Sequence, residues 1–148
     1  MRFVPLTGQD DRARLLAIAT QDMSVGYHAT LERELDDVAD GASRGICAVD
    51  GTTPVGYAVY HRTIQTYHLD TIVVDRARRG EGIGTGLLAS IRAALREAAP
   101  VILNVVTDAT ASETLAFYRR SGFVVAGYVK DEFLPGVIQA HLTLEVRR

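Results

Sequence analysis

Cysteine and tryptophan are almost missing from this chain of 148 residues, which contains one cysteine and no tryptophan. A single cysteine excludes an intramolecular disulfide and any metal site built from several cysteines. Cys47 stands in the apolar stretch Ile46–Val49, where a small core residue is the ordinary interpretation and a nucleophile the rarer one. The sequence therefore predicts neither a disulfide framework nor a bound metal.

The chain also lacks a long apolar run and a strong excess of one charge. No stretch of about 18 apolar residues could span a bilayer, and the start Met1–Leu6 does not resemble the apolar part of a signal peptide. The net charge is -2 without a basic block, which argues against a nucleic acid as the main partner. With 47% hydrophobic residues, we expect a single domain over residues 1–148, located in the cytoplasm and away from membranes.

Glycine, in contrast, is concentrated between an apolar β-rich run and an amphipathic helix. The run ends at Val74, four glycines lie within 80–86, and apolar residues recur every four positions from Ile83 to Leu95. This pattern predicts a strand, a glycine turn and a helix. Glycines let a backbone approach a ligand closely, and the first N–H groups of a helix favour an anion such as phosphate.

The spacing of these glycines distinguishes between several known kinds of phosphate-binding loop. A dinucleotide fingerprint needs G-x-G-x-x-G, but Thr85 and Leu87 stand where its last glycine would be. A P-loop needs Gly-Lys-Ser/Thr, whereas Gly86 is followed by leucine. The segment Arg79–Gly84 matches Arg/Gln-x-x-Gly-x-Gly and resembles the acetyl-CoA pyrophosphate loop of the GNAT family of N-acetyltransferases. The alternative to a cofactor-binding loop is a turn that only changes the direction of the chain, but such a turn rarely needs four glycines.

The other segments predict alternating strands and helices. Strands are expected at 3–6, 46–49, 55–60, 68–74, 101–106, 123–125 and 138–146, and helices at 10–21, 28–40, 83–98 and 114–120. A capping-box pattern at Thr110–Glu113 precedes the last helix, and Gly122 is placed to end it. The order βααβββαβαββ predicts an α/β (α+β) fold with a mixed sheet of six or seven strands and helices on both faces. The GNAT family has the same order.

A second segment, Leu115–Phe123, resembles the GNAT helix that carries a tyrosine and closes with Gly-Phe. The resemblance implies that Tyr118 donates a hydrogen bond or a proton to the leaving thiolate, and a tyrosine that only packs on the sheet is the alternative. Ala111 replaces an asparagine that often contacts the cofactor in the family, so Ser112 or Asp108 would substitute for it. The resemblance implies acetyl-CoA as co-substrate, no metal, and these cofactor-binding residues: Ile72, Val73, Val74, Arg79, Gly80, Glu81, Gly82, Ile83, Gly84, Thr85, Gly86 and Ser112.

The implied reaction moves an acetyl group to a primary amine of a small molecule or peptide, by direct attack in a ternary complex. A backbone N–H near Val73 and Val74 would stabilise the oxyanion, and an acceptor must take a proton from the ammonium. His68 and Asp70 share a strand face because side chains alternate. Arylalkylamine-type members of the family carry two histidines at the corresponding positions, so the resemblance makes either residue a candidate base, with water as the alternative.

Other functions stay open from the sequence alone. The chain could be a non-catalytic CoA-binding regulatory module, or an acyltransferase that uses another acyl-CoA or a hydroxyl acceptor. The expected partners are acetyl-CoA and an amine, and a homodimer could form through the final strands. The expected helix at 28–40 has an acidic face, which is interpreted as solvated; if it lined a substrate mouth, it would attract amines. Its acids are Glu32, Glu34, Asp36, Asp37 and Asp40.

Overall fold

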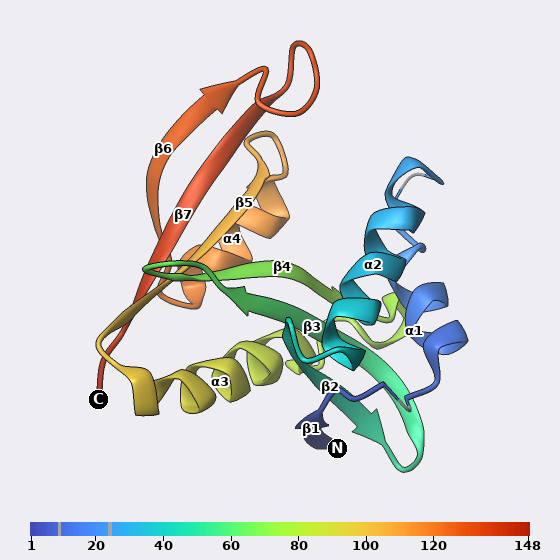
Figure 1. The fold of residues 1–148 in the computed structure, drawn as a ribbon. Coiled ribbons are helices and arrows are strands. Elements are labelled where there is room, and N and C mark those ends of the chain that lie inside the picture. The colour runs from blue at the N-terminus through green and yellow to red at the C-terminus, as the bar shows by residue number, and fades with distance from the viewer. Residues whose placement is uncertain (9, 24) are drawn as a thin grey trace. The chain divides into compact units, whose positions relative to one another are not determined.

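All predicted strands and helices are present in a computed structural model that describes residues 1–148 except 9 and 24 (Figure 1). The strands are β1 (Arg2–Pro5), β2 (Arg44–Asp50), β3 (Thr53–Arg62), β4 (Tyr67–Val74), β5 (Val101–Asp108), β6 (Val124–Lys130) and β7 (Ile138–Val146). The helices are α1 (Arg12–Ala19), α2 (His28–Ala39), α3 (Ile83–Leu95) and α4 (Ser112–Arg120). The predicted order βααβββαβαββ is confirmed. None of the described helices is long and apolar enough to cross a membrane.

The seven strands form one mixed sheet in the order β1-β2-β3-β4-β5-β7-β6. β4 and β5 pair in parallel, whereas β1 with β2, β2 with β3, β5 with β7 and β6 with β7 pair antiparallel. A parallel pair needs a long crossover, and α3 lies in the segment that joins β4 to β5. The predicted α+β class with a mixed sheet is therefore confirmed.

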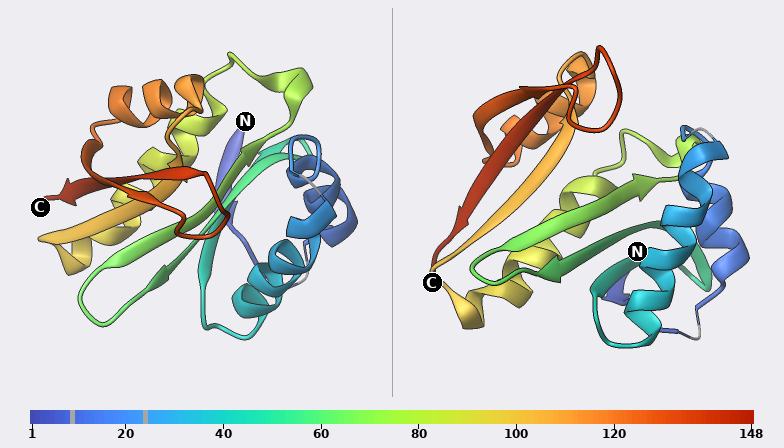
Figure 2. Two further views of the ribbon diagram at one scale, coloured as in Figure 1. Left: turned by 90° about the horizontal axis from the view of Figure 1, so that it is seen from above. Right: turned by 45° about the horizontal axis from the view of Figure 1, so that its top comes forward.

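The chain divides into two compact units. Unit 1 consists of Met1–Arg62 and Leu69–Ala94, and unit 2 consists of Thr63–His68 and Leu95–Arg148. The first two residues of β4 thus belong to unit 2 and the remainder to unit 1. Unit 2 contains the β6–β7 hairpin, drawn in orange to red in Figure 2. The expectation of one domain over residues 1–148 stays a prediction.

Helices cover both faces of the strands in unit 1. One face packs against α1 and α2 through a cluster of buried residues: Leu6, Leu15, Ala19, Leu31, Leu35, Val38, Cys47, Val49, Tyr57 and Val59. Gly56 lies on the other face, where a Cβ would come within 3.3 Å of Ile83 in α3. Cys47 has no exposed surface, and burial raises the pKa of its thiol to about 11, which agrees with a core residue.

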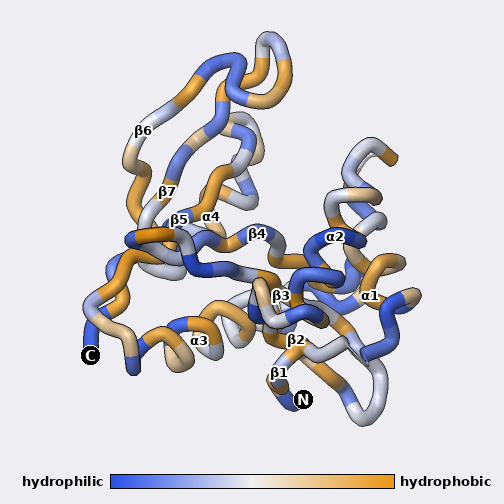
Figure 3. The backbone as a smooth tube through the Cα atoms, viewed as in Figure 1, coloured by the Kyte–Doolittle hydropathy of each residue, from blue (hydrophilic) through white to orange (hydrophobic). Residues whose placement is uncertain are grey.

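α2 has one apolar and one polar face, visible as alternating orange and blue along its length in Figure 3. Its buried residues are Leu31, Leu35 and Val38, and its exposed acids are Glu32 and Asp36, with Asp40 at its end. Glu34 and Asp37 are half-buried. The interpretation of a solvated acidic face therefore holds for the exposed acids but not for Glu34 and Asp37.

Unit 2 is built on β5, β7 and β6, with α4 between β5 and β6 along the chain. The capping box predicted at Thr110–Glu113 is wrong, because the N-cap is Ala111, whose methyl group cannot accept a hydrogen bond. The Thr110 hydroxyl instead donates to Asp108 at 2.7 Å. Gly122, with φ of +100°, ends the helix as predicted.

Candidate active site

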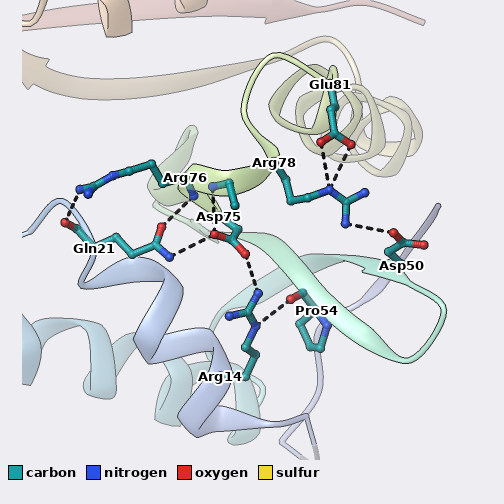
Figure 4. Close-up of polar contacts among 9 residues, drawn as sticks. Arg14, Gln21, Asp50, Pro54, Asp75, Arg76, Arg78 and Glu81 are labelled. Carbon is teal, nitrogen blue, oxygen red and sulfur yellow. Dashed lines mark hydrogen bonds and ion pairs between the residues drawn. The ribbon is translucent and has the colours of Figure 1, made fainter.

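Asp75 directly follows β4 and stabilises the start of the segment that leads to the glycine loop (Figure 4). Its carboxylate accepts hydrogen bonds from Gln21 Nε2 at 3.1 Å, Arg14 Nη2 at 2.6 Å and the backbone N–H of Ala77 at 3.2 Å. The bonds from Gln21 and then Arg14 hold the pKa of Asp75 below its usual value. Arg14 also donates to the carbonyl of Pro54 at 3.1 Å. These hydrogen bonds link the start of the loop to α1 and β3.

Each of the three arginines that precede the loop faces a carboxylate. Asp22 lies between Arg76, at 2.6 Å, and Arg79. Hydrogen bonds from Arg79, and then from Arg76, hold the pKa of Asp22 below its usual value. Arg78 Nε lies 3.0 Å from a carboxylate oxygen of Glu81 (Figure 4). A phosphate would therefore compete with Asp22 for Arg79.

The glycine loop has a backbone conformation that glycine adopts without strain. Gly80 and Gly82 have φ of +83° and +82°, a region that L side chains rarely occupy. α3 begins at Ile83, and the Gly86 N–H donates to the carbonyl of Gly82 at 3.0 Å. The N–H groups of 83–85 precede that first bond of the helix, so they point out of its N-terminus, where an anion is favoured.

Gly86 is required by packing within unit 1. A Cβ at Gly86 would lie 2.1 Å from Cζ of Phe3 in β1, which is too close for any real contact. We expect Gly86→Ala to lower Tm by roughly 2–10 °C, as overpacked side chains do. Thermal unfolding followed by circular dichroism measures this loss. Phe3→Leu combined with Gly86→Ala should restore most of it, and an unchanged Tm in Gly86→Ala alone would contradict the packing argument.

The end of β4 leads directly into this loop. Ile72, Val73 and Val74 are half-buried, and Val73 packs against the core cluster under α1 and α2. The side chain of Ile83 is only 3% exposed, so its backbone N–H, and not its side chain, can face a ligand. Unit 1 thus brings together the strand end and the loop that the sequence assigned to cofactor binding.

The two candidate bases on β4 have different partners. His68 belongs to unit 2, where its Nδ1 lies 2.5 Å from Oδ1 of Asn104 in β5. Asp70 belongs to unit 1, where its Oδ2 lies 2.7 Å from Nδ1 of His61 in β3. Both side chains are half-buried between buried neighbours along 67–71, as strand alternation predicts. His61 and Asp70 are nine residues apart in the chain, and they meet because β3 and β4 are neighbours in the sheet.

Glu34 in α2 is a further acid near β4 that the sequence did not distinguish from the other acids of the helix. The hydroxyl of Thr71 in β4 donates to Oε1 of Glu34 at 2.5 Å. Burial raises the pKa of Glu34 to about 7; the bond from Thr71 opposes this shift, and the charges of Asp70 and Asp37 add to it. Glu34 stands three residues after Leu31 and four before Val38, a helical spacing that places it along the apolar stripe of α2.

Tyr118 lies in unit 2 and is 5% exposed. Its ring centroid is 5.3 Å from those of Phe117 and Phe123. Burial raises the pKa of its hydroxyl, so the hydroxyl keeps its proton at neutral pH and can donate a hydrogen bond. Ser112, in the same unit, is the exposed first residue of α4, and its hydroxyl lies 3.5 Å from the carbonyl of Thr110.

Within the described ranges 1–8, 10–23 and 25–148, no three His, Cys, Asp or Glu residues are placed to hold a metal ion together.

The structure resembles several solved acetyltransferases. A protein from Desulfovibrio desulfuricans assigned to the GNAT family is 23% identical, with a TM-score of 0.88 and 98% of each chain covered. A GNAT family acetyltransferase from Elizabethkingia anophelis with acetyl-CoA bound is 20% identical, with a TM-score of 0.77 and 97% of each chain covered. The aminoglycoside 6'-N-acetyltransferase from Enterococcus faecium is 15% identical, with a TM-score of 0.77, covering 99% of this chain and 97% of its own. These similarities show the fold.

The sequence itself carries the family assignment. A comparison with curated proteins gives no match. A family model described as an acetyltransferase (GNAT) domain matches residues 42–125, more than half of the chain and including β4, the glycine loop and the tyrosine of α4. The protein therefore belongs to the GNAT family of acetyltransferases.

Proposed function

We propose that the protein transfers the acetyl group of acetyl-CoA to a primary amine of a small molecule or a peptide. The observation that carries this proposal is the glycine loop, whose backbone leads into the N-terminus of α3 with the N–H groups of 83–85 directed outward. Family membership supports it, as do the acetyl-CoA bound to the Elizabethkingia anophelis relative and the amine acetylation named for the Enterococcus faecium relative.

The cofactor would lie along the end of β4 and the loop. Its diphosphate would accept hydrogen bonds from the loop backbone over 80–85, with Arg79 as a cationic partner once Asp22 is displaced. The N–H groups near Ile72, Val73 and Val74 would bind the acetyl group and its carbonyl oxygen. Ser112 at the start of α4 is proposed as a further contact. Gly86 would contribute through close packing, since its N–H is already bonded to Gly82.

The chemistry needs no covalent enzyme intermediate. The neutral amine attacks the thioester carbonyl, and a backbone N–H near Val73 or Val74 stabilises the oxyanion that forms. The C–S bond then breaks, and the Tyr118 hydroxyl donates a hydrogen bond to the leaving thiolate. His68 and Asp70 are the base candidates from the sequence. Holding the amine and thioester in line would supply much of the rate.

A homodimer through the final strands is part of the proposal. β6 is an edge strand of the sheet. Apolar side chains at least 39% exposed lie on β6, β7 and their connection: Val124, Tyr128, Val129, Phe133, Leu134 and Ile138. Burial of such residues against a second copy would remove them from water.

The proposed function is tested by release of free thiol from acetyl-CoA in the presence of a panel of acceptors. The panel should contain alkylamines, aminoglycosides, peptides with free amino groups, and matched alcohols. We expect release with at least one amine and an acetylated amine as product by mass spectrometry. CoA binding by calorimetry without release from any acceptor would identify a CoA-binding module instead. Release only with alcohols, or only from longer acyl-CoA, would also contradict the proposal.

A further inference from the structure

A row of hydrogen-bonded side chains runs within unit 2 from the turn before β4 to β5. Its members are Thr63 and Thr66 of the turn, His68 of β4 and Asn104 of β5. Oδ1 of Asn104 lies 2.5 Å from Nδ1 of His68, and Nδ2 of Asn104 lies 3.2 Å from the hydroxyl oxygen of Thr66. The hydroxyl oxygens of Thr66 and Thr63 are 2.8 Å apart. The histidine and the asparagine also face each other in the parallel pairing of β4 with β5.

The direction of these hydrogen bonds is set at the threonine end of the row. The hydroxyl oxygen of Thr63 lies 3.0 Å from the carbonyl oxygen of Thr66. A carbonyl cannot donate, so the Thr63 hydroxyl gives its single hydrogen to that carbonyl. The hydrogen between the two hydroxyl groups must then come from Thr66. Because a hydroxyl has only one hydrogen, the Thr66 oxygen can only accept from Asn104.

This direction fixes the amide of Asn104 and, through it, the ring of His68. Since Thr66 accepts, the NH2 group of Asn104 faces Thr66 and the amide oxygen faces His68. An amide oxygen only accepts, so Nδ1 of His68 carries a hydrogen. A neutral imidazole has a single N–H, and its lone pair is therefore on Nε2. The hydrogen-bonded row thus selects one tautomer of His68.

We propose that Asn104 is a positioning residue that holds His68 in the tautomer whose Nε2 accepts a proton from the attacking amine. The inference rests on the proposed N-acetyl transfer, in which His68 is a candidate base. The ammonium donates one proton to Nε2, directly or through a water molecule, which leaves a neutral amine and an imidazolium. The nitrogen lone pair forms the C–N bond, the C–S bond breaks, and a second nitrogen proton passes to the thiolate. The imidazolium then releases its proton to water.

An amide suits this task in both protonation states of the ring. Nδ1–H donates to Oδ1 of Asn104 before and after the proton transfer, so no side chain has to turn over when His68 becomes charged. A carboxylate in the same place would also orient the ring, but it would stabilise the imidazolium and retain the proton. Asn104 therefore orients the base and lets it release the proton.

The titratable groups on the same strand faces have partners of their own. Side chains alternate along a strand, and paired residues of neighbouring strands share a face, which places Asp70 with His68 on β4 and the others with Asn104 on β5 and β7. The pairs are Asp70 with His61, Asp108 with Thr110, His141 with Glu132, and Glu145 with Arg147. Substitution of Asn104 removes none of these contacts.

The first test is the tautomer of His68, which nitrogen NMR of the imidazole rings reports without any turnover. The chain has four histidines, and the signals of His68 are those that disappear in His68→Gln. At a pH where the ring is neutral, we expect the Nδ1–H form in the wild type. Asn104→Leu keeps a side chain of similar size without an acceptor and should give a mixture of the two tautomers. Asn104→Asp should retain the Nδ1–H form, because a carboxylate also accepts.

The second test is the pH dependence of kcat/KM with an amine that supports thiol release. The wild-type value should rise with pH as His68 loses its proton. Asn104→Leu should lower kcat/KM by roughly 10- to 100-fold, a part of what a positioned base contributes. Asn104→Asp should restore most of the activity at high pH, while the rising limb moves to higher pH because the carboxylate stabilises the imidazolium.

Two further positions provide controls. Thr66→Val removes the hydroxyl that accepts from Asn104, so the amide can turn over and both readouts should move toward those of Asn104→Leu. Thr66→Ser keeps the hydroxyl and should behave as wild type. Thr143→Val alters the β7 residue that pairs with Asn104 and should change neither the tautomer nor the limb. Thermal unfolding verifies that each variant is folded, and Thr66→Val provides the answer if Asn104→Leu does not fold.

The outcomes separate this proposal from the proposed function. A wild-type ring with its hydrogen on Nε2, or an Asn104→Leu protein with an unchanged tautomer, overturns the proposal. An altered tautomer with unchanged kcat/KM overturns the catalytic role of Asn104, and a His68→Gln enzyme that keeps the wild-type limb overturns the base on which Asn104 acts. A protein that acetylates no amine overturns the proposed function itself, which the tautomer measurement does not test.

Discussion

Gly84→Asp is expected to weaken CoA binding by at least about 100-fold and leave the protein folded. Gly84 is the second residue of α3, in the turn whose outward N–H groups are proposed to hold the diphosphate. An aspartate there places a side chain and a negative charge where the phosphate oxygens would lie. Two like charges in contact at a helix N-terminus repel, and the backbone donors would bond to the new carboxylate instead.

The same substitution should not unfold the protein. α3 has no acid in its first turn, and an aspartate at a helix N-terminus interacts favourably with the helix dipole. The loss of binding is therefore separable from a loss of structure. Calorimetry with CoA measures the affinity, and thermal unfolding measures the fold.

Gly84→Ala is the matched control for Gly84→Asp, because it adds a Cβ without charge. If charge dominates, the alanine variant should retain more affinity than the aspartate variant. Wild-type affinity in a folded Gly84→Asp protein would refute the location of the diphosphate at this helix terminus.

Tyr118→Phe is expected to lower kcat by roughly 10- to 1000-fold, the range for a lost acid or positioned donor. The substitution removes only the hydroxyl, and the ring contacts with Phe117 and Phe123 at 5.3 Å remain. Tm and CoA affinity should therefore stay near their wild-type values. Because burial raises the pKa of this hydroxyl, we expect it to act as a retained hydrogen-bond donor to the thiolate.

The measurement is kcat at saturating acetyl-CoA and amine, combined with a pre-steady-state experiment that reveals any limiting product release. Tyr128→Phe is the control, since Tyr128 lies on β6 in the same unit and is 59% exposed. It should leave kcat unchanged. An unaltered rate of the chemical step in Tyr118→Phe would show that Tyr118 serves packing alone.

The order of the elements was readable from the sequence because it depends on short-range patterns. The recurrence of apolar residues from Ile83 to Leu95 and the alternation at the start of β4 report the helix and strand directly. Gly122 ends α4 because its φ of +100° is one that glycine adopts readily. The capping box failed because Thr110 bonds to Asp108, a local competitor that the pattern alone does not weigh.

The partners of the reactive side chains were not readable in the same way. Asp70 was expected to share a strand face with His68, the other candidate base, and its carboxylate lies 2.7 Å from His61 on β3. Asp22 faces Arg76 and Arg79 before the loop, more than 50 residues away along the chain. Such contacts depend on strand register and on where a distant loop folds back.

The sequence by itself determined the family, the element order and the glycine loop, because each is encoded in consecutive residues with a fixed spacing. Only the tertiary structure distinguished Glu34 from the other acids of α2. Its partial burial raises its pKa to about 7 despite the opposing hydrogen bond from Thr71, while Glu32, two residues away, is exposed to water. Burial and proximity are properties of the packed chain, and they decide which of several identical carboxyl groups titrates near neutral pH.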